Sequence, residues 1–157
     1  MKKINYILFL IGFFAVQGLF ADNINALLFS LKECKHDTER IITYNSLALA
    51  YNNAYNYEEA QKYNQLSLSL SKKLNYLKGE MRAYVIKGNI FYNQSINDSA
   101  KFYFNKALEI AKAKNMPASI AACLNLLGNT EESTGNLNLA LKYYLESLKY
   151  GEKANDP

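Results

Sequence analysis

Apolar and small residues recur three or four positions apart along most of the chain, which is the spacing of one face of an α-helix. The middle of the chain shows the pattern most fully, at Met81, Tyr84, Val85, Gly88, Phe91, Ala100, Tyr103, Phe104, Ala107, Leu108 and Ala111. The polar segment 93–99 interrupts it and predicts a turn between two helices, with Asp98 capping the second helix. No run of β-branched residues alternates with polar ones, so the sequence predicts an all-α fold.

The helical pattern repeats with a fixed period of forty positions, which relates residues such as Ala60 and Ala100. Four columns keep one residue type throughout: Ala60, Ala100 and Ala140; Tyr63, Tyr103 and Tyr143; Leu68, Leu108 and Leu148; Asn75, Asn115 and Asn155. Two more columns hold only small residues: Ser67, Ala107 and Ser147; Ala48, Gly88 and Gly128. We therefore divide the chain into repeats 37–76, 77–116 and 117–156, each a pair of antiparallel helices. Because one pair cannot bury both of its faces, we expect the pairs to stack into a right-handed α-solenoid.

The two ends of this array differ. Residues 22–36 predict a helix, the second of a partial repeat, that covers the first full repeat with Ile24, Leu27, Leu28, Leu31 and Cys34. The last helix is apolar nearly all round, through Leu137, Leu139, Leu141, Tyr143, Tyr144, Leu145, Leu148 and Tyr150. Terminal repeats normally present a polar outer face. Either the array continues beyond Pro157, which we favour, or the last helix is an interface or a surface for self-association.

The repeats resemble the tetratricopeptide repeat (TPR). The second repeat carries the resemblance at Tyr84, Gly88, Phe91, Ala100, Phe104 and Ala107, and the third at Leu124, Leu127, Gly128, Ala140, Tyr144 and Ser147. The first repeat departs from it, because Asn64 and Ser67 replace an aromatic residue and an alanine. The usual unit is about 34 residues long, and the longer, forty-residue unit here resembles the repeats of bacterial signalling and scaffold proteins. The resemblance implies a non-enzymatic scaffold that binds a protein or peptide segment.

In TPR proteins the first helix of each pair lines a concave groove that holds the partner. Carried onto this chain, the predicted groove residues are Asn45, Asn52, Arg82, Asn89, Tyr92, Asn125, Asn129 and Glu132. The same columns also hold Ile42, Leu49, Val85 and Ala122. Asparagine suits this role because its amide both donates and accepts hydrogen bonds and so can pair with any peptide backbone. The alternative is that these residues reflect a chain rich in asparagine, with 19 in total, and a helix face exposed to water.

The first 21 residues are typical of a secretory signal peptide: Lys2 and Lys3, then an apolar run over residues 7–16, then small residues. Cleavage after Ala21 or after Gly18 fits the sequence. The alternative is an uncleaved membrane anchor, since residues 4–21 approach the ~20 residues that span a bilayer. We favour cleavage, which predicts an exported protein, periplasmic or extracellular.

Composition excludes several classes of function. The net charge of +4 falls to +2 without Lys2 and Lys3, too little for a nucleic-acid-binding surface. Cys34 and Cys123 lie two repeats apart and cannot form a disulfide within the chain, and one histidine, His36, cannot make a metal site alone. The sequence has no motif of a nucleotide-binding loop, a zinc protease or a serine hydrolase. We predict no enzyme activity, no cofactor and no metal.

Two functions therefore remain for the sequence. The first is a scaffold outside the cytoplasm that binds a protein or peptide in its concave groove. The alternative is the N-terminal sensory region of a longer membrane-bound bacterial histidine kinase or transcription regulator, because exported arrays of this long-unit type resemble such regions. On that alternative, a transmembrane helix and an output domain would follow the array.

Overall fold

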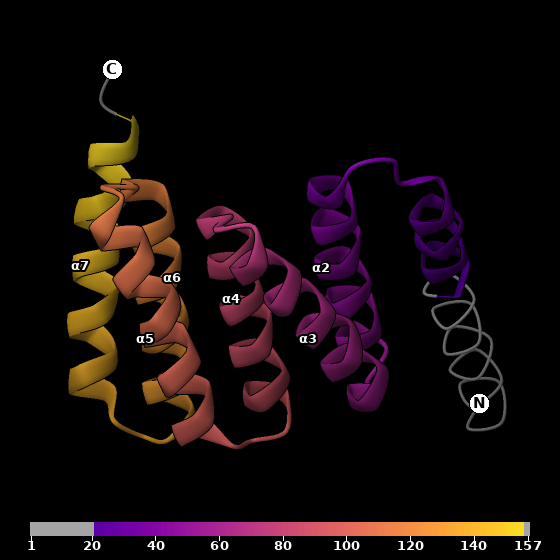
Figure 1. Cartoon of the computed structure of the whole chain (residues 1–157). Coiled ribbons are helices and arrows are strands. Elements are labelled where there is room, and N and C mark those ends of the chain that lie inside the picture. The colour runs from indigo at the N-terminus through magenta and orange to yellow at the C-terminus, as the bar shows by residue number, and fades with distance from the viewer. Residues whose placement is uncertain (1–20, 156–157) are drawn as a thin grey trace, which may run out of the picture.

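The structure, a computed structural model, describes residues 21–155, so the predicted signal peptide lies almost wholly outside the described residues. Residues 21–33 are helical, and six helices follow: α2 (Asp37–Asn53), α3 (Tyr57–Lys73), α4 (Leu77–Asn93), α5 (Asn97–Ala113), α6 (Pro117–Ser133) and α7 (Leu137–Asn155). They lie side by side in chain order (Figure 1). Residues 21–155 contain no strand, which confirms the all-α class. We call α2, α4 and α6 the first helices and α3, α5 and α7 the second helices.

The turns between the helices recur at a regular interval along the chain. Each places one residue in the left-handed region of backbone conformation, at Tyr55, Asn75, Ser95, Asn115 and Gly135, with φ of 59°, 53°, 60°, 49° and 81°. Asparagine tolerates this conformation better than most residues because its short side chain hydrogen-bonds locally. This accounts for the asparagine column at 75 and 115, since both residues make the turn from one repeat to the next. The predicted cap is wrong: the N-cap of α5 is Ile96, and Asp98 is exposed and pairs with Lys101 at 3.4 Å.

Aromatic rings fill the space within the second and third repeats because glycine leaves room for them. A Cβ atom on Gly88 would lie 2.4 Å from Cε1 of Phe104, and one on Gly128 would lie 2.5 Å from Cε1 of Tyr144. Phe104 is fully buried in the largest apolar cluster, which joins α4, α5 and α6. The first repeat has Ala48 and Asn64 at the corresponding positions, and both are buried.

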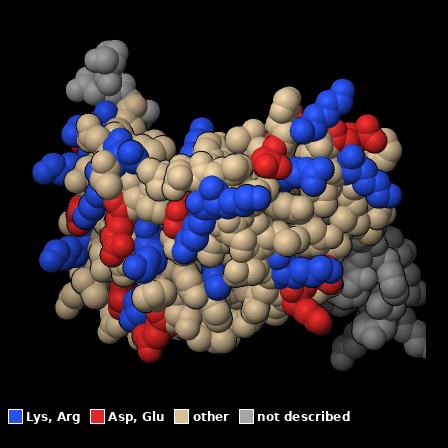
Figure 2. All heavy atoms as spheres, in the orientation of Figure 1, with Lys and Arg blue, Asp and Glu red and all other residues tan. Residues whose placement is uncertain are grey.

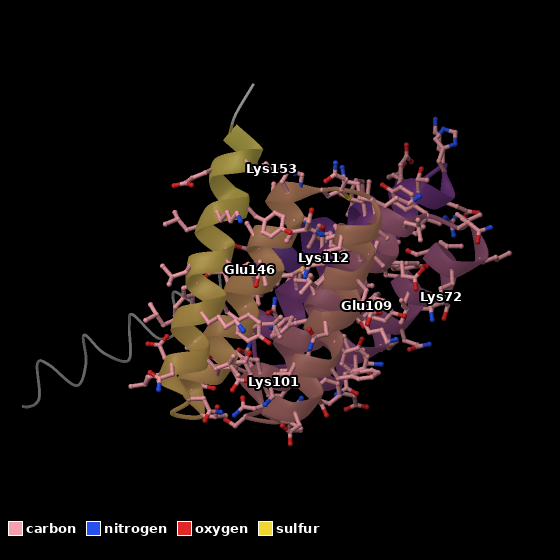
Figure 3. All side chains as sticks on the ribbon, turned by 90° about the vertical axis from the view of Figure 1, so that its left-hand side faces the viewer. Lys72, Lys101, Glu109, Lys112, Glu146 and Lys153 are labelled. Atoms are coloured by element: carbon pink, nitrogen blue, oxygen red, sulfur yellow. The ribbon has the colours of Figure 1, made fainter. Side chains whose placement is uncertain are left out.

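The two ends of the array are covered to different extents. The apolar stripe of residues 24–34 is half-buried, and a hollow of about 260 Å³ remains between this segment and α2, lined by Asn23, Leu27, Ser46, Leu49, Ala50 and Asn53. At the other end α7 leaves leucine side chains in water, Leu137, Leu141, Leu145 and Leu148, each between 57% and 64% exposed. Figure 3 looks onto this end, with Glu146 of α7 beside Lys112 of α5, an ion pair at 3.9 Å.

Candidate peptide-binding groove

Two of the eight predicted groove residues are buried in the structure. Asn45 is 1% exposed and Asn52 is 2% exposed, so neither is open to a partner, and the prediction is wrong for both. The reason is that α2 lies close along α4, which places this side of α2 against the next first helix instead of water. The 45 and 52 columns therefore face the following repeat.

The exposure of these two columns rises along the array, as this packing requires. In the 45 column, Asn45 is buried, Val85 is half-buried and Asn125 is exposed. In the 52 column, Tyr92 is half-buried against the apolar cluster, whereas Glu132 is exposed. Asn125 and Glu132 are open because no described helix covers that side of α6.

The three remaining predicted residues are accessible. Arg82 is exposed on α4, Asn89 is half-buried on the same helix, and Asn129 is exposed on α6. Asn129 and Glu132 are brought together by Tyr144, whose hydroxyl lies 2.6 Å from Oε2 of Glu132 and 2.8 Å from Oδ1 of Asn129. The hydrogen bond to Glu132 favours the neutral phenol and raises the pKa of Tyr144 to about 12. These residues form a hydrogen-bonded group on the open side of α6.

A hollow of about 280 Å³ lies between α4 and α6, where the first helices do not approach as closely as α2 and α4 do. Its walls are Lys78, Met81, Arg82 and Val85 from α4, and Met116, Ser119, Ala122 and Cys123 from α6. The floor is apolar, with Met81 9% exposed and Cys123 1% exposed. We call this the α4–α6 hollow. Arg82 is the only one of the eight predicted groove residues in its wall.

Two columns of the repeat pattern differ between the junction of α2 with α4 and the junction of α4 with α6, where the hollow lies. Gly79 lies in the first turn of α4, and a Cβ atom there would lie 2.7 Å from Cγ2 of Ile41 on α2. Because Gly79 has no Cβ atom, α4 can approach α2 closely. Forty positions later Ser119 takes the place of Gly79, and Met81 takes the place of Ile41. Ser119 and Met81 both line the hollow, and Ser119 has a side chain at the position where Gly79 has none. In the sequence, the feature that could have indicated this hollow is the column of Gly79 and Ser119, and the predicted groove did not include that column.

The lining of the α4–α6 hollow is apolar and cationic. Its wall contains no carboxylate and no imidazole. Burial raises the pKa of the Cys123 thiol to about 11, so the thiol stays protonated and unreactive at neutral pH. Among residues 21–155 no group of three or more His, Cys, Asp or Glu side chains is placed to hold a metal ion.

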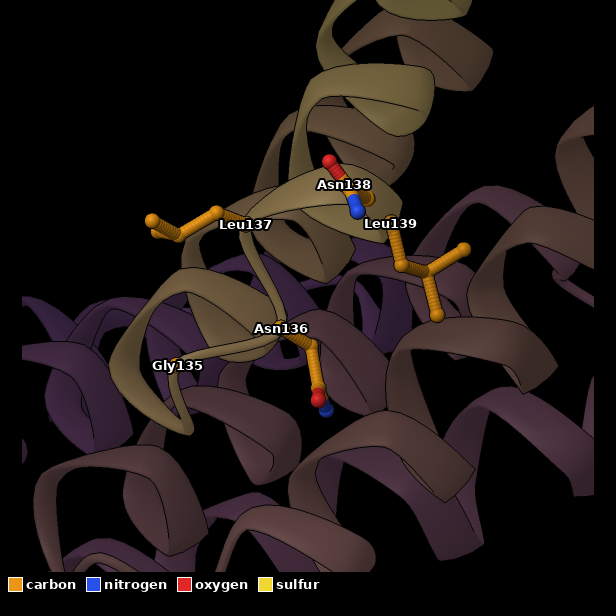
Figure 4. Close-up of a pocket in the computed structure, with 5 residues that line it drawn as sticks. All are labelled: Gly135, Asn136, Leu137, Asn138 and Leu139. Carbon is orange, nitrogen blue, oxygen red and sulfur yellow. The ribbon is translucent and has the colours of Figure 1, made fainter.

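Other surface features of the described residues are less suited to hold a ligand. A hollow of about 610 Å³ lies on the turn between α6 and α7 and is lined by five consecutive residues, Gly135, Asn136, Leu137, Asn138 and Leu139. Figure 4 shows Leu137 and Leu139 pointing to opposite sides, so their side chains do not converge on a ligand. Figure 2 shows positive and negative side chains interspersed on the face it presents. Within the described part of the chain, no helix is both long and apolar enough to cross a membrane.

Comparison with known proteins agrees with this architecture. The structure is similar to that of BtubC (BKLC) from P. vanneervenii, with a TM-score of 0.72 and 15% identity over 85% of this chain and 57% of that one. It is also similar to the apo form of RapI, with a TM-score of 0.72 and 18% identity over 88% of this chain and 40% of that one. At this identity the likeness shows the fold alone, and the chain spans 57% or less of either structure.

No curated protein sequence matches the chain. Sequence models of the tetratricopeptide repeat match residues 40–75, 82–114 and 120–157, one stretch in each of the three repeats. Together these stretches cover more than half of the chain. A fold of this kind supports protein–protein interaction, because stacked helix pairs present an extended surface to a partner. The chain belongs to the tetratricopeptide repeat family.

Proposed function

We propose that this protein is a non-enzymatic scaffold that holds a peptide or protein segment on the surface formed by its first helices, with the α4–α6 hollow as the main contact. The observation that carries the proposal is the hollow itself. It combines a buried apolar floor, Met81 and Cys123, with exposed polar residues, Lys78 and Arg82, at its mouth. An apolar concavity with a few polar groups at its edge is the usual form of a binding site.

The test is to fill the hollow without disturbing the core. Ala122 is exposed in its wall, so Ala122→Trp adds an indole where a partner side chain would lie. Peptides are first selected from a random displayed library on the unaltered protein, and the affinity of the selected peptides is measured by fluorescence anisotropy. We expect Ala122→Trp to weaken binding at least tenfold and Asn89→Ala to weaken it less.

The matched control lies on another surface. Lys106→Ala removes a half-buried lysine of α5 whose ion pair is with Glu109, on its own helix. It should leave affinity unchanged. Equal losses from Lys106→Ala and Ala122→Trp, with melting temperatures unchanged, would count against a binding site on the first helices.

We also propose that the scaffold works outside the cytoplasm, on the strength of the first 21 residues. Expression of the full chain in a bacterial host, followed by mass determination of the product, tests this. A product that begins at Leu19 or Asp22 in the periplasm or medium supports export. A product that retains Met1 in the membrane indicates an anchor, and one that retains it in the cytoplasm contradicts export.

A second candidate function rests on the exposed leucines of α7. If the array continues into further repeats and then into a membrane-bound output domain, this face is covered by the next first helix, as α3 is covered by α4. We infer that the chain then serves as a sensory region. Sequencing the gene past the codon of Pro157 tests this directly. A second copy of the chain could cover the leucines of α7 instead, and light scattering of the purified chain tests whether it self-associates.

A further inference from the structure

We propose that the α4–α6 hollow selects a segment in which a bulky apolar side chain stands next to an aspartate or glutamate. The proposal rests on the proposed function, since it names the partner chemistry of the same site. It follows from three observations: the size and lining of the hollow, the cations on one wall, and the absence of anions from the hollow.

The hollow fits one side chain. Its volume of about 280 Å³ lies just below the ~300–1,000 Å³ typical of pockets that enclose a small-molecule ligand. Met81 and Val85 line the hollow from α4, and Met116 and Cys123 line it from the α6 side. Methionine is flexible and polarizable, so it adapts its shape to an aliphatic or aromatic guest. A leucine, methionine or phenylalanine side chain is therefore the expected occupant.

The cations stand on one wall only. Lys78 and Arg82 are four residues apart on α4, both exposed, and neither makes an ion pair within residues 21–155. Like charges at this spacing repel slightly, and a carboxylate between them relieves the repulsion. The guanidinium of Arg82 can hold a carboxylate with two parallel hydrogen bonds. The corresponding residues of α6 are Ala118 and Ala122, which carry no charge.

This asymmetry sets the orientation of the segment. Its apolar side chain enters between Met81 and Met116, and its carboxylate turns toward α4. No wall residue of the hollow is acidic, so nothing there neutralises the two cations before the partner arrives. A segment with lysine or arginine in place of the acid would meet repulsion from both.

The experiment compares the peptides selected by three forms of the protein from one random displayed library. The forms are the unaltered chain, Lys78→Glu/Arg82→Glu, and Arg40→Glu. The control Arg40→Glu reverses the other arginine of the chain, which is exposed on α2 and lies outside the hollow. We expect the unaltered chain and Arg40→Glu to enrich Asp or Glu next to Leu, Met or Phe, and the double variant to enrich Lys or Arg there instead.

An isosteric change that removes the negative charge then tests the contact itself. In a selected peptide, replacement of the acid by its amide should weaken binding at least fivefold to the unaltered chain and clearly less to Arg82→Gln, since that variant retains only Lys78 as a cation beside the acid. Helix content and the urea midpoint of each variant are measured first, and Arg82→Gln serves where the double variant does not fold.

The outcomes separate the two proposals. Enriched peptides that lack an acidic residue, or an amide effect of the same size in Arg82→Gln, overturn the inference. If such peptides still lose affinity with Ala122→Trp, the proposed function stands without it. If no selected peptide responds to Ala122→Trp, the hollow is not the binding site and both proposals fail.

Discussion

Two junctions between repeats use the same columns of the repeat pattern, yet only one leaves a hollow. Junction 1 packs α2 and α3 against α4, and junction 2 packs α5 against α6, with α4 on the other side of the α4–α6 hollow. In junction 1 the first helices lie close together, because Gly79 admits Ile41. In junction 2 they stand further apart, and Ser119, which has a side chain where Gly79 has none, lines the hollow between them.

The interiors of the two junctions differ in their apolar content, and here the more open junction is the more apolar one. Junction 1 is close and has a smaller apolar cluster, Ala48, Ala60, Ile86 and Ile90, beside buried polar groups. Asn64 donates from Nδ2 to the carbonyl of Ala83 at 2.8 Å, while Oδ1 of Asn45 and of Asn52 and Oγ of Ser71 are buried with no hydrogen-bond partner within the described residues. Junction 2 is open at its edge but apolar within. Its buried residues include Phe104, Ile120, Cys123, Leu124 and Leu127.

The contrast teaches that close approach and strong packing are separate properties. Small or polar residues let backbones come close but bury little apolar area, whereas large apolar residues bury more and hold the helices apart. Stability in a solenoid is approximately a sum over repeats and their interfaces. We therefore expect junction 2 to be the stronger interface and junction 1 the weaker, with the α4–α6 hollow at the stronger one.

The largest test removes the main side chain of each interior. Phe104→Ala should destabilise the protein by about 3–5 kcal/mol, because it deletes a fully buried ring. Asn64→Ala, at the corresponding position of junction 1, should cost about 1–2 kcal/mol, because it removes one buried hydrogen bond. Urea unfolding followed by circular dichroism measures both. Equal costs would mean that the two interiors contribute alike and would remove the basis of the comparison.

A second test converts junction 1 toward junction 2. Gly79→Ser should cost about 1–3 kcal/mol, since its Cβ would lie 2.6 Å from Oγ of Ser71 and from Cδ1 of Tyr76. Hydrogen exchange should rise along α2 as Asn45 becomes accessible. The reverse change, Ser119→Gly, introduces no clash and should cost no more than the ~1 kcal/mol of a glycine in a helix. A silent Gly79→Ser would show that this residue does not set the spacing.

Much of the fold was predictable because it depends on local patterns that recur. The helical spacing of Tyr84, Gly88 and Phe104 requires only the geometry of one helix pair, and the three repeats each reproduce that geometry. The positive φ of Gly135 also follows from one residue type. These features do not depend on how closely one repeat approaches the next.

The site was less predictable because it depends on that approach. Asn45 and Asn125 share a column and a residue type, yet the first is buried and the second is exposed. The family pattern assigns both to the groove, and only the neighbouring helix distinguishes them. Lys78 and Met116 were missed for the same reason, since they lie at the start of their helices and reach the hollow only where α4 and α6 diverge.

A third test asks whether the polar interior of junction 1 weakens it. Asn45→Val places the residue of the second repeat, Val85, in the first. It removes a buried amide oxygen that has no partner within the described residues, and we expect a gain of about 1 kcal/mol. The control Asn53→Val changes an exposed asparagine on the same helix and should give no gain. A loss with Asn45→Val would mean that its amide makes a contact on which junction 1 depends.

The smallest expected effect tests whether the junctions differ in their interiors alone. The turns Asn75 and Asn115 have nearly the same φ, 53° and 49°, and each joins one repeat to the next. Asn75→Ala and Asn115→Ala should each cost about 0.5–1 kcal/mol, because alanine has no side chain to support a left-handed residue, and glycine at either position should restore stability. The two costs, measured by urea unfolding, should agree with each other. A larger cost at Asn115 would mean that the turn and the apolar interior of junction 2 act together. The spacing of α4 and α6 would then be set partly by the chain that connects α5 to α6, and not by Ser119 and Met81 alone.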